Sequence, residues 1–366
     1  MSTIADRADR LTALVAEREL DLLVVSNLVN VRYLTRFSGT NAIVVIGPET
    51  RVFGTDFRYI DRVRATLADY ELRRAKADIL EVPAAVVEER ASGERKLRVG
   101  FDDAHLTVRT HARLGKLLGD RAELAAAGGL VEELRAVKDP EEVDAMRRAA
   151  ALADDLYGWL AAEHGLAGHS ERAVALALEH RAKELGAEGL SFPPIIAEGA
   201  NGAQPHAEPR EVEIPRDTLV VVDLGCVVDG YCSDCTRTFA TGSIDDEAKA
   251  VYGLVQEAQA AALAEVRAGA GARDLDGIAR RIIEEGGHGD EFGHGLGHGV
   301  GLEVHEAPTL TPRAEGNLVS GNAVTVEPGV YVSGRFGVRI EDLVIVDDGG
   351  CEVLTSTPKD LTTVGP

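Results

Sequence analysis

Glycine occupies alternate positions in the segment from Gly293 to Gly301. Glycine in a helix interior costs about 1 kcal/mol relative to alanine, so this segment is predicted to be extended, with its backbone packed close to a neighbour. The segment carries His294 and His298, which have the spacing of a helical zinc pair but share one face of an extended chain. His305 follows, on the opposite face unless the chain bends. The alternative is a purely structural role for these histidines.

Two aspartates accompany a predicted hairpin. β-Prone runs flank Asp229-Gly230, which predicts a two-residue loop between antiparallel strands. In this register Asp234 lies opposite Gly225, and Asp223 lies on its diagonal and on the same face, about 7–8 Å away at the backbone. The glycine would leave room for two carboxylates that converge on one ion. The alternative is that Asp223 caps a turn and Asp234 is solvated.

Two glutamates also interrupt β-branched, strand-like runs. Glu327 lies within residues 324–331 and Glu341 within residues 337–346. A glutamate inside a buried strand needs a partner, and two of them beside the aspartates and histidines suggest one shared ion site. Oxygen ligands with a single imidazole suit Mn²⁺, Co²⁺, Zn²⁺ or Fe²⁺, and the carboxylate count favours manganese. The carboxylates would balance two divalent cations, and a two-metal site can activate water for hydrolysis.

Cysteine offers a competing interpretation through Cys232-x-x-Cys235, a redox or zinc motif. A redox pair normally opens a helix, whereas this pair lies in a strand pattern and has no second pair to complete a zinc site. The sparse cysteines favour a reducing compartment. The four cysteines are Cys226, Cys232, Cys235 and Cys351.

The net charge of the chain limits the classes of partner that it is expected to bind. The chain has 39 Lys and Arg against 61 Asp and Glu, a net charge of −22, which argues against binding nucleic acid or an anionic membrane. Charged residues between Asp6 and Arg10 interrupt any apolar signal-peptide region, and no apolar run approaches the roughly 18 residues of a membrane span. A cytoplasmic location is therefore expected.

An α/β domain is predicted for residues 1–135, because helical and strand patterns alternate there. The expected helices are 4–20 and 107–118, and the expected strands are 22–25, 42–46 and 98–101. Residues 33–39 predict a turn with aromatic anchors. The small residues 125–129 predict a flexible stretch before the boundary.

A second domain is predicted for residues 136–366. It opens on a capping box, with Asp139 as N-cap, Pro140 as the first helical residue and Glu142 as the reciprocal partner. Helices and strands then segregate, which predicts an α+β domain with an antiparallel sheet. The expected helices run from 140 to about 163, from about 170 to 185, from about 245 to 267 and from 272 to 285.

In their order along the chain, these motifs resemble the pita-bread metallopeptidases: aminopeptidase P, prolidase and, more distantly, methionine aminopeptidase. The resemblance covers essentially the whole chain, since residues 33–39 and 55–59 are similar to the creatinase-type N-terminal domain and residues 358–361 to the family's tail. It implies an α/β creatinase-like domain (1–135) followed by an α+β pita-bread catalytic domain (136–366). It also implies a homodimer.

The resemblance implies two divalent metal ions, most simply Mn²⁺. The implied ligands are Asp223, Asp234, His298, Glu327 and Glu341. Asp234 and Glu341 would bridge the ions, and Glu327 would also handle the proton of the attacking water. His305 would contact the substrate carbonyl and stabilise the oxyanion.

Further positions match the family's pattern around the ligands. His206 matches a substrate-side histidine, His294 would support the ligands from behind, and Arg339 matches an arginine two residues before the last ligand. Tyr231 and Arg237 match framework positions of the hairpin. Arg36 and Cys235 depart from the commoner residues at their positions.

The implied activity is hydrolysis of the Xaa-Pro bond at the N-terminus of a small peptide with proline at its second position. The alternative is an Xaa-Pro dipeptidase (prolidase), which needs a cation for the product-side carboxylate; Arg339 is the candidate. A metal-free creatinase-like hydrolase and a non-catalytic peptide-binding module are less favoured, because all five ligand positions are filled.

Overall fold

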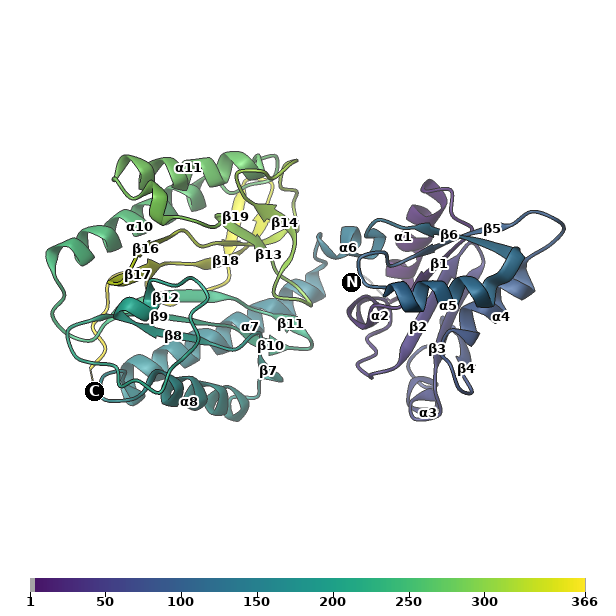
Figure 1. The fold of residues 1–366 in the computed structure, drawn as a ribbon, viewed down its shortest axis with the longest axis horizontal. Coiled ribbons are helices and arrows are strands. Elements are labelled where there is room, and N and C mark those ends of the chain that lie inside the picture. Colours follow the sequence, from purple (N-terminus) through teal and green to yellow (C-terminus); the bar gives the residue numbers. More distant parts are fainter. Residues whose placement is uncertain (1–3, 366) are drawn as a thin grey trace. The chain divides into compact units, whose positions relative to one another are not determined.

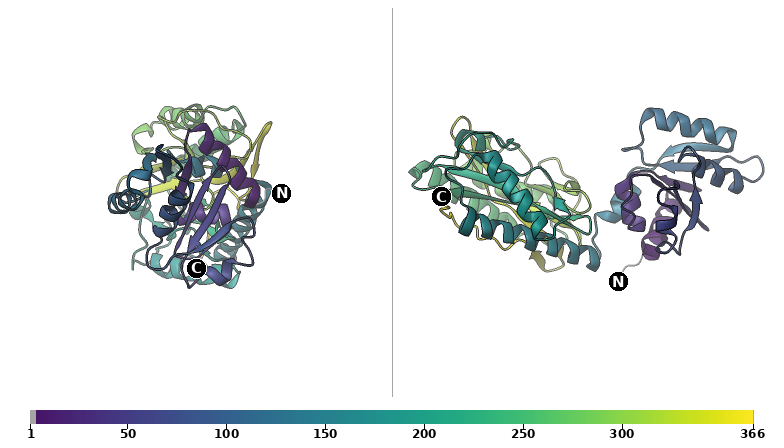
Figure 2. Two further views of the ribbon diagram at one scale, coloured as in Figure 1. Left: turned by 90° about the vertical axis from the view of Figure 1, so that its right-hand side faces the viewer. Right: turned by 90° about the horizontal axis from the view of Figure 1, so that it is seen from below.

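The structure is a computed structural model that describes residues 4–365. The chain divides into two compact units, and the division falls between Arg135 and Ala136. Each unit is described by itself below (Figures 1 and 2). Among the described residues, no helix is long and apolar enough to cross a membrane.

The first unit is built on one mixed six-stranded sheet with the order β4-β3-β2-β1-β5-β6. The strands are β1 (Leu22–Val25), β2 (Ala42–Gly47), β3 (Thr50–Thr55), β4 (Glu71–Arg74), β5 (Leu97–Phe101) and β6 (Ala122–Ala126). The helices are α1 (Ile4–Glu17), α2 (Leu28–Thr35), α3 (Ile60–Val63), α4 (Glu81–Arg90), α5 (Val108–Leu118) and α6 (Leu130–Arg135). Apolar side chains of β1, β2, α4 and α5 form one core of this unit.

The alternating pattern of the first unit is confirmed for its predicted helices and for β1, β2 and β5, but two expectations are wrong. Tyr33 to Thr35 form the last turn of α2 instead of a turn, and Ala125 and Ala126 pair with β5 as the end of β6 instead of forming a flexible stretch. Helix α2 ends at Arg36, whose backbone is left-handed with φ 59°. That conformation favours glycine, which explains why an arginine is unusual at this helix end.

The second unit has two helix pairs with antiparallel strands between them, as Figure 1 shows. The helices are α7 (Pro140–Trp159), α8 (Glu171–Glu184), α9 (Gly199–Gly202), α10 (Asp246–Ala264) and α11 (Ala272–Glu285). One core cluster joins α7 and α8 to β9 and β12, and another joins α10 and α11 to β15 and β18. This confirms the predicted α+β architecture.

The strands of this unit form several small sheets, all with antiparallel pairs. They are β7 (Gly189–Leu190), β8 (Ile195–Glu198), β9 (Leu219–Leu224), β10 (Cys226–Val228), β11 (Tyr231–Cys232), β12 (Cys235–Ala240), β13 (Gly297–Gly299), β14 (Glu306–Leu310), β15 (Ala323–Val326), β16 (Gly329–Val332), β17 (Phe336–Arg339), β18 (Asp342–Asp347) and β19 (Gly350–Val353). The larger sheets have the orders β12-β9-β8 and β14-β13-β15-β18-β19.

The capping box that opens α7 is confirmed. The Asp139 carboxylate accepts hydrogen bonds from the backbone N–H groups of Glu141 and Glu142, each 3.0 Å long, and the Glu142 carboxylate accepts one of 2.9 Å from the Asp139 N–H. The other Glu142 oxygen accepts a 2.9 Å hydrogen bond from the Tyr231 hydroxyl. The helix start is thereby tied to the hairpin that carries the two aspartates.

The glycine-alternating segment is extended and closely packed, as predicted. It forms β13, which pairs with β14 on one side and β15 on the other. A Cβ atom on Gly297 would lie 2.1 Å from the Thr325 carbonyl oxygen, and one on Gly299 would lie 2.3 Å from the Ala307 carbonyl oxygen. The absence of side chains at these positions lets the central strand approach both of its neighbours.

We expect Gly297→Ala to lower the free energy of unfolding by about 2 kcal/mol, because the new methyl group would push β13 away from β15. Gly293→Ala is the matched control, since a Cβ there meets no atom within 4 Å. Urea denaturation of both variants measures the difference. Equal stability of the two variants would contradict the close approach.

Candidate metal centre

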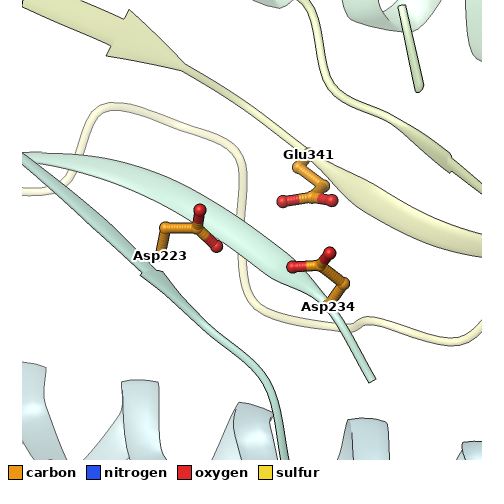
Figure 3. A group of neighbouring side chains, drawn as sticks. All are labelled: Asp223, Asp234 and Glu341. Carbon is orange, nitrogen blue, oxygen red and sulfur yellow. The ribbon is translucent and has the colours of Figure 1, made fainter. Parts of the chain in front are cut away.

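Three carboxylates converge in the second unit, and each lies in a different strand or immediately before one. Asp223 lies in β9, Asp234 immediately precedes β12, and Glu341 immediately precedes β18. The pairing of Asp223 with Thr236 confirms the predicted hairpin register and puts both aspartates on one side of the ladder. One oxygen from each of the three buried carboxylates lies within 4.8 Å of the others, and Figure 3 shows the side chains pointing toward one another.

Gly225 is required for a different reason from the one expected. A Cβ atom there would lie 1.8 Å from the Ser233 carbonyl oxygen. The close approach therefore involves the backbone beside Asp234 and not its carboxylate.

The sequence pattern suggested that the two glutamates lie within strands, and this is wrong. Glu327 occupies the break between β15 and β16, and Glu341 occupies the break between β17 and β18. Their own N–H groups still bond to carbonyl groups, those of Leu296 and Thr236 respectively. A break in the strand leaves the backbone paired while the side chain turns into the cluster.

His298 brings a nitrogen to the carboxylates. Its Nε2 lies 3.1 Å from Glu327 Oε1 and 3.6 Å from Asp234 Oδ2. Its Nδ1 is 3.1 Å from the Gly299 carbonyl oxygen, which can only accept, so the proton is assigned to Nδ1. Nε2 also carries a proton in the absence of a metal ion and donates it to Glu327: burial alone would lower the pKa of His298, but this hydrogen bond and the charge of Glu327 raise it. A metal ion at this site would replace the proton on Nε2.

Unsatisfied oxygens show that the cluster fits a cation. Asp223 Oδ1 and Glu341 Oε1 are buried and have no hydrogen-bond partner among the described residues. Their second oxygens are bonded, since Asp223 Oδ2 accepts from Arg339 Nη2 at 2.6 Å and Glu341 Oε2 accepts from Thr236 Oγ1 at 2.7 Å. Buried carboxylate oxygens are costly unless paired or metal-bound, and Asp223 and Glu341 each have one oxygen fixed and one available for a cation.

The carboxylates of the cluster differ in the direction in which their pKa values are shifted. Burial and the neighbouring carboxylates raise the pKa of Asp234 and of Glu341 well above the usual range. Burial also raises the pKa of Asp223, although Arg339 opposes it. Burial alone would raise the pKa of Glu327, but the hydrogen bond and charge of His298 outweigh it and lower the pKa to about 2. Without a cation, the protein therefore holds protons at this site.

Arg339 organises one side of the cluster. Beside its bond to Asp223, its guanidinium donates to Thr236 Oγ1 at 2.9 Å, to the Tyr331 hydroxyl at 2.8 Å and to the Pro205 carbonyl at 3.1 Å. The Tyr331 hydroxyl is also 2.9 Å from Nε2 of His294. The sequence motifs indicated Arg339 and His294. They did not indicate Thr236, which links Arg339 to Glu341, or Tyr331, which links Arg339 to His294.

His298 and His305 come together because the chain bends after β13; without such a bend they are expected on opposite faces. The ring centroids of His298 and His305 are 4.3 Å apart. Burial, and then the charge of His298, lower the pKa of His305, and burial lowers that of His294. Both rings therefore favour the neutral form at pH 7, in which one nitrogen donates and the other accepts.

A cavity of about 510 Å³ opens over the cluster. It is lined by the five predicted ligands together with His206, His294, His305 and Arg339. Its remaining wall is mostly apolar and rich in proline, with Phe192, Pro193, Pro194, Pro205 and Pro209. His206 lies on this wall, in the segment between α9 and β9.

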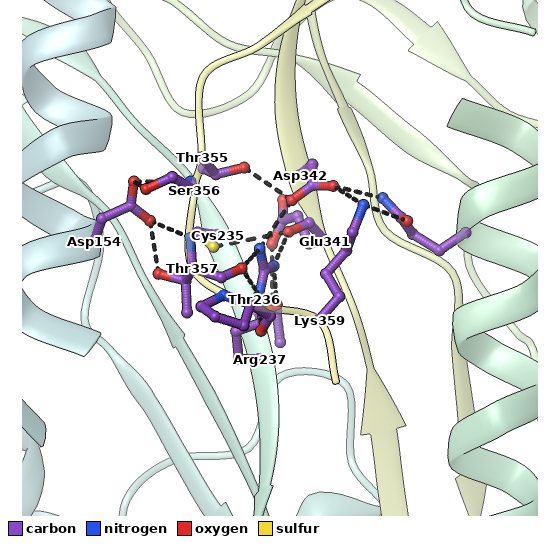
Figure 4. Close-up of polar contacts among 12 residues, drawn as sticks. Asp154, Cys235, Thr236, Arg237, Glu341, Asp342, Thr355, Ser356, Thr357 and Lys359 are labelled. Carbon is purple, nitrogen blue, oxygen red and sulfur yellow. Dashed lines mark hydrogen bonds and ion pairs between the residues drawn. The ribbon is translucent and has the colours of Figure 1, made fainter. Parts of the chain in front are cut away.

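A second network supports Glu341 from the side opposite the cavity (Figure 4). The buried Arg237 guanidinium donates to the Glu341 carbonyl oxygen, to Asp342 Oδ1 at 2.9 Å and to the Thr357 carbonyl oxygen at 2.6 Å. Asp342 Oδ2 accepts a 2.6 Å bond from Lys359 Nζ. The backbone that carries Glu341 is therefore fixed by a strand and by the segment after β19.

The cysteine interpretation is not supported. Cys232 and Cys235 are buried in strands and are not joined by a disulfide bond. Burial raises the pKa of the Cys235 thiol well above its usual range, and its Sγ contacts the Glu341 carbonyl oxygen at 3.7 Å. A reactive thiol needs a lowered pKa and access, and Cys235 has neither.

Comparison with known proteins gives two family matches. The model for metallopeptidase family M24 matches residues 144–348, and the model for the Creatinase/Prolidase N-terminal domain matches residues 7–137. An Xaa-Pro dipeptidase from Pyrococcus furiosus is 34% identical over 97% of this chain and 99% of its own length.

Solved structures agree over the full length. An Xaa-Pro dipeptidase from Bacillus anthracis has a TM-score of 0.94 and 36% identity, covering 99% of this chain and 100% of its own. An X-Pro aminopeptidase from Thermotoga maritima has a TM-score of 0.88 and 32% identity, covering 98% of this chain and 100% of its own.

We expect Mn²⁺ binding to the metal-stripped protein to release protons, and the apparent affinity to rise with pH. Asp234 and Glu341 hold protons between their ordinary and raised pKa values, and a cation binds only the ionised carboxylates. Calorimetry in two buffers of different ionisation enthalpy measures the release. Binding with no proton release would contradict the raised pKa values.

Proposed function

The chain belongs to metallopeptidase family M24, with a creatinase-type N-terminal domain before a pita-bread catalytic domain, and on that premise we propose that it hydrolyses the Xaa-Pro bond at the N-terminus of peptides. Membership of the family makes it a peptide-bond hydrolase. One observation carries the proposal: carboxylates with unsatisfied buried oxygens, next to an imidazole nitrogen of His298, open on a proline-rich cavity. We place the domain boundary at residues 135 and 136.

We propose that two divalent ions are held by five side chains and that both ions are Mn²⁺. The ligands are Asp223, Asp234, His298, Glu327 and Glu341. The predominance of carboxylate oxygen supports manganese over a softer metal. When bound, the ions would supply Lewis acidity and a water of lowered pKa.

The chain's own residues divide the remaining work. Glu327, ionised beside His298, would accept the proton of the attacking water on its carboxylate and pass it on. Neutral His305 would donate to the substrate carbonyl as its oxygen becomes negative. His206 would contact the substrate from the opposite wall. Arg339 and His294 hold the ligands in place and do not meet the reacting atoms.

The state of Arg339 favours aminopeptidase P-like activity over dipeptidase activity. A dipeptide places a carboxylate beside the proline, and this group needs a cation. Among the described residues that line the cavity, Arg339 is the one Lys or Arg, and four of its five N–H donors are taken by Asp223, Thr236, Tyr331 and Pro205. The relatives named as dipeptidases keep prolidase activity as the alternative.

We also propose a cytoplasmic homodimer. The sparse cysteines support a reducing compartment, and the family resemblance supports the dimer. The substrate would be a small peptide with proline at its second position, with no part for nucleic acid or membrane.

A product assay tests the proposed reaction. The metal-stripped, Mn²⁺-reconstituted protein is given Ala-Pro, Ala-Pro-Ala and Ala-Ala-Ala. We expect release of alanine from Ala-Pro-Ala, with slower cleavage of Ala-Pro and none of Ala-Ala-Ala. Cleavage of Ala-Pro alone would establish the dipeptidase alternative, and cleavage of neither proline peptide would overturn the substrate class.

We expect Glu327→Gln to lower kcat by about 10²–10⁴-fold, because the amide cannot accept the proton from water. Glu315→Gln is the control, since Glu315 is exposed and carries the same charge. Steady-state kinetics with Ala-Pro-Ala, alongside a metal assay of each variant, measure the effect. Turnover near that of the control would remove Glu327 from the mechanism.

A further inference from the structure

Glu171 is a buried carboxylate that lies outside the metal centre. It is the first residue of α8, and its side chain is 0% exposed. A charged group is rarely buried to this degree unless its hydrogen bonds are complete, since an unpaired buried charge is strongly destabilising. Its partners therefore indicate what it holds in place.

The partners of Glu171 come from both ends of one loop. At the start of the loop, Oε1 accepts from the Glu198 N–H at 2.9 Å, and both oxygens accept from Asn201 Nδ2 at 3.0–3.1 Å. At its end, Oε2 accepts from the N–H and Nε of Arg210 at 2.8 and 3.0 Å, and Oε1 accepts from Arg210 Nη2 at 3.0 Å. One carboxylate thus closes the loop from residue 198 to 210.

The same loop forms a wall of the cavity. Pro205, His206, Ala207, Glu208 and Pro209 all line it. The middle of the loop is held separately, because the Pro205 carbonyl accepts a 3.1 Å bond from Arg339 Nη1. The loop is thereby fixed at its two ends by Glu171 and at its tip by the residue that also binds Asp223.

We propose that Glu171 is a positioning residue for substrate binding, which fixes loop 199–209 and through it His206 against the cavity. The inference rests on the proposed function for the use of His206, but not for the restraint of the loop. Charge-assisted bonds are about twice as strong as neutral ones, and a fully satisfied buried network rigidifies its surroundings. Glu171 itself does not contact the substrate.

The restraint is tested on the metal-free protein by amide hydrogen exchange. In Glu171→Gln an NH₂ group replaces one acceptor and faces N–H donors, so we expect exchange in residues 199–209 to rise about tenfold while β9 is unchanged. Glu179→Gln is the matched control, because Glu179 lies on the same helix in an exposed pair with Lys183. Equal exchange in the two variants would overturn the proposal.

A second variant guards against misfolding. Arg210→Gln removes the bidentate partner from the exposed side, where the Arg210 side chain is 41% exposed, and leaves the carboxylate in place. We expect the same localised rise in exchange. Protection of the loop equal to wild type in this variant would contradict the closure by Glu171.

Kinetics test the link to His206. With Ala-Pro-Ala and Mn²⁺, Glu171→Gln is expected to raise KM about tenfold with kcat within about threefold and metal content unchanged. In a His206→Ala background the same change should raise KM less than about threefold. Full additivity would overturn the link to His206. If the wild type does not cleave the peptide, the proposed function fails while the exchange result still decides on the restraint.

Discussion

Mutual repulsion of buried carboxylates is the constraint on which the catalytic unit depends. Asp223, Asp234 and Glu341 bring three negative charges within 4.8 Å of one another where water cannot screen them. Arg339 compensates Asp223, and His298 compensates Glu327. Among the described residues, Glu341 has no side-chain ion pair, and Asp234 has only the His298 ring that it shares with Glu327, so protons or metal ions must complete the balance. The site is thus stable only when it binds metal ions or protons.

The surrounding fold supplies rigid supports for these charges. Each acidic ligand has a backbone anchor: a strand for Asp223, a hairpin for Asp234, and strand breaks for Glu327 and Glu341. Thr236 holds two of these residues at once, because its hydroxyl donates to Glu341 and accepts from Arg339. Asp223 and Glu341 are held by groups that are themselves held, which keeps one oxygen of each available.

Local chemistry explains which parts could be predicted from the sequence. The extended β13, the hairpin register and the capping box of α7 follow from glycine spacing, a two-residue turn and an N-cap, all within a few residues. The break at Glu341 and the roles of Tyr331 and Glu171 depend on partners far along the chain. Glu171 has the sequence signature of an ordinary helix start, and only the folded loop distinguishes it. The assigned ligand roles stay predictions drawn from family resemblance and placement.

The support behind Glu341 has a consequence for the order of assembly. Asp154, in α7, binds the backbone and hydroxyl of Thr357, a partner 203 residues away, and the Thr357 carbonyl in turn accepts from the Arg237 that holds Glu341. Contacts of such long sequence separation form late, because the loop that they close must be ordered first. A nascent chain that has not yet been extended to Thr357 lacks the last support of a ligand. The support of Glu341 is therefore complete only after the segment beyond β19 has docked against α7 and Arg237.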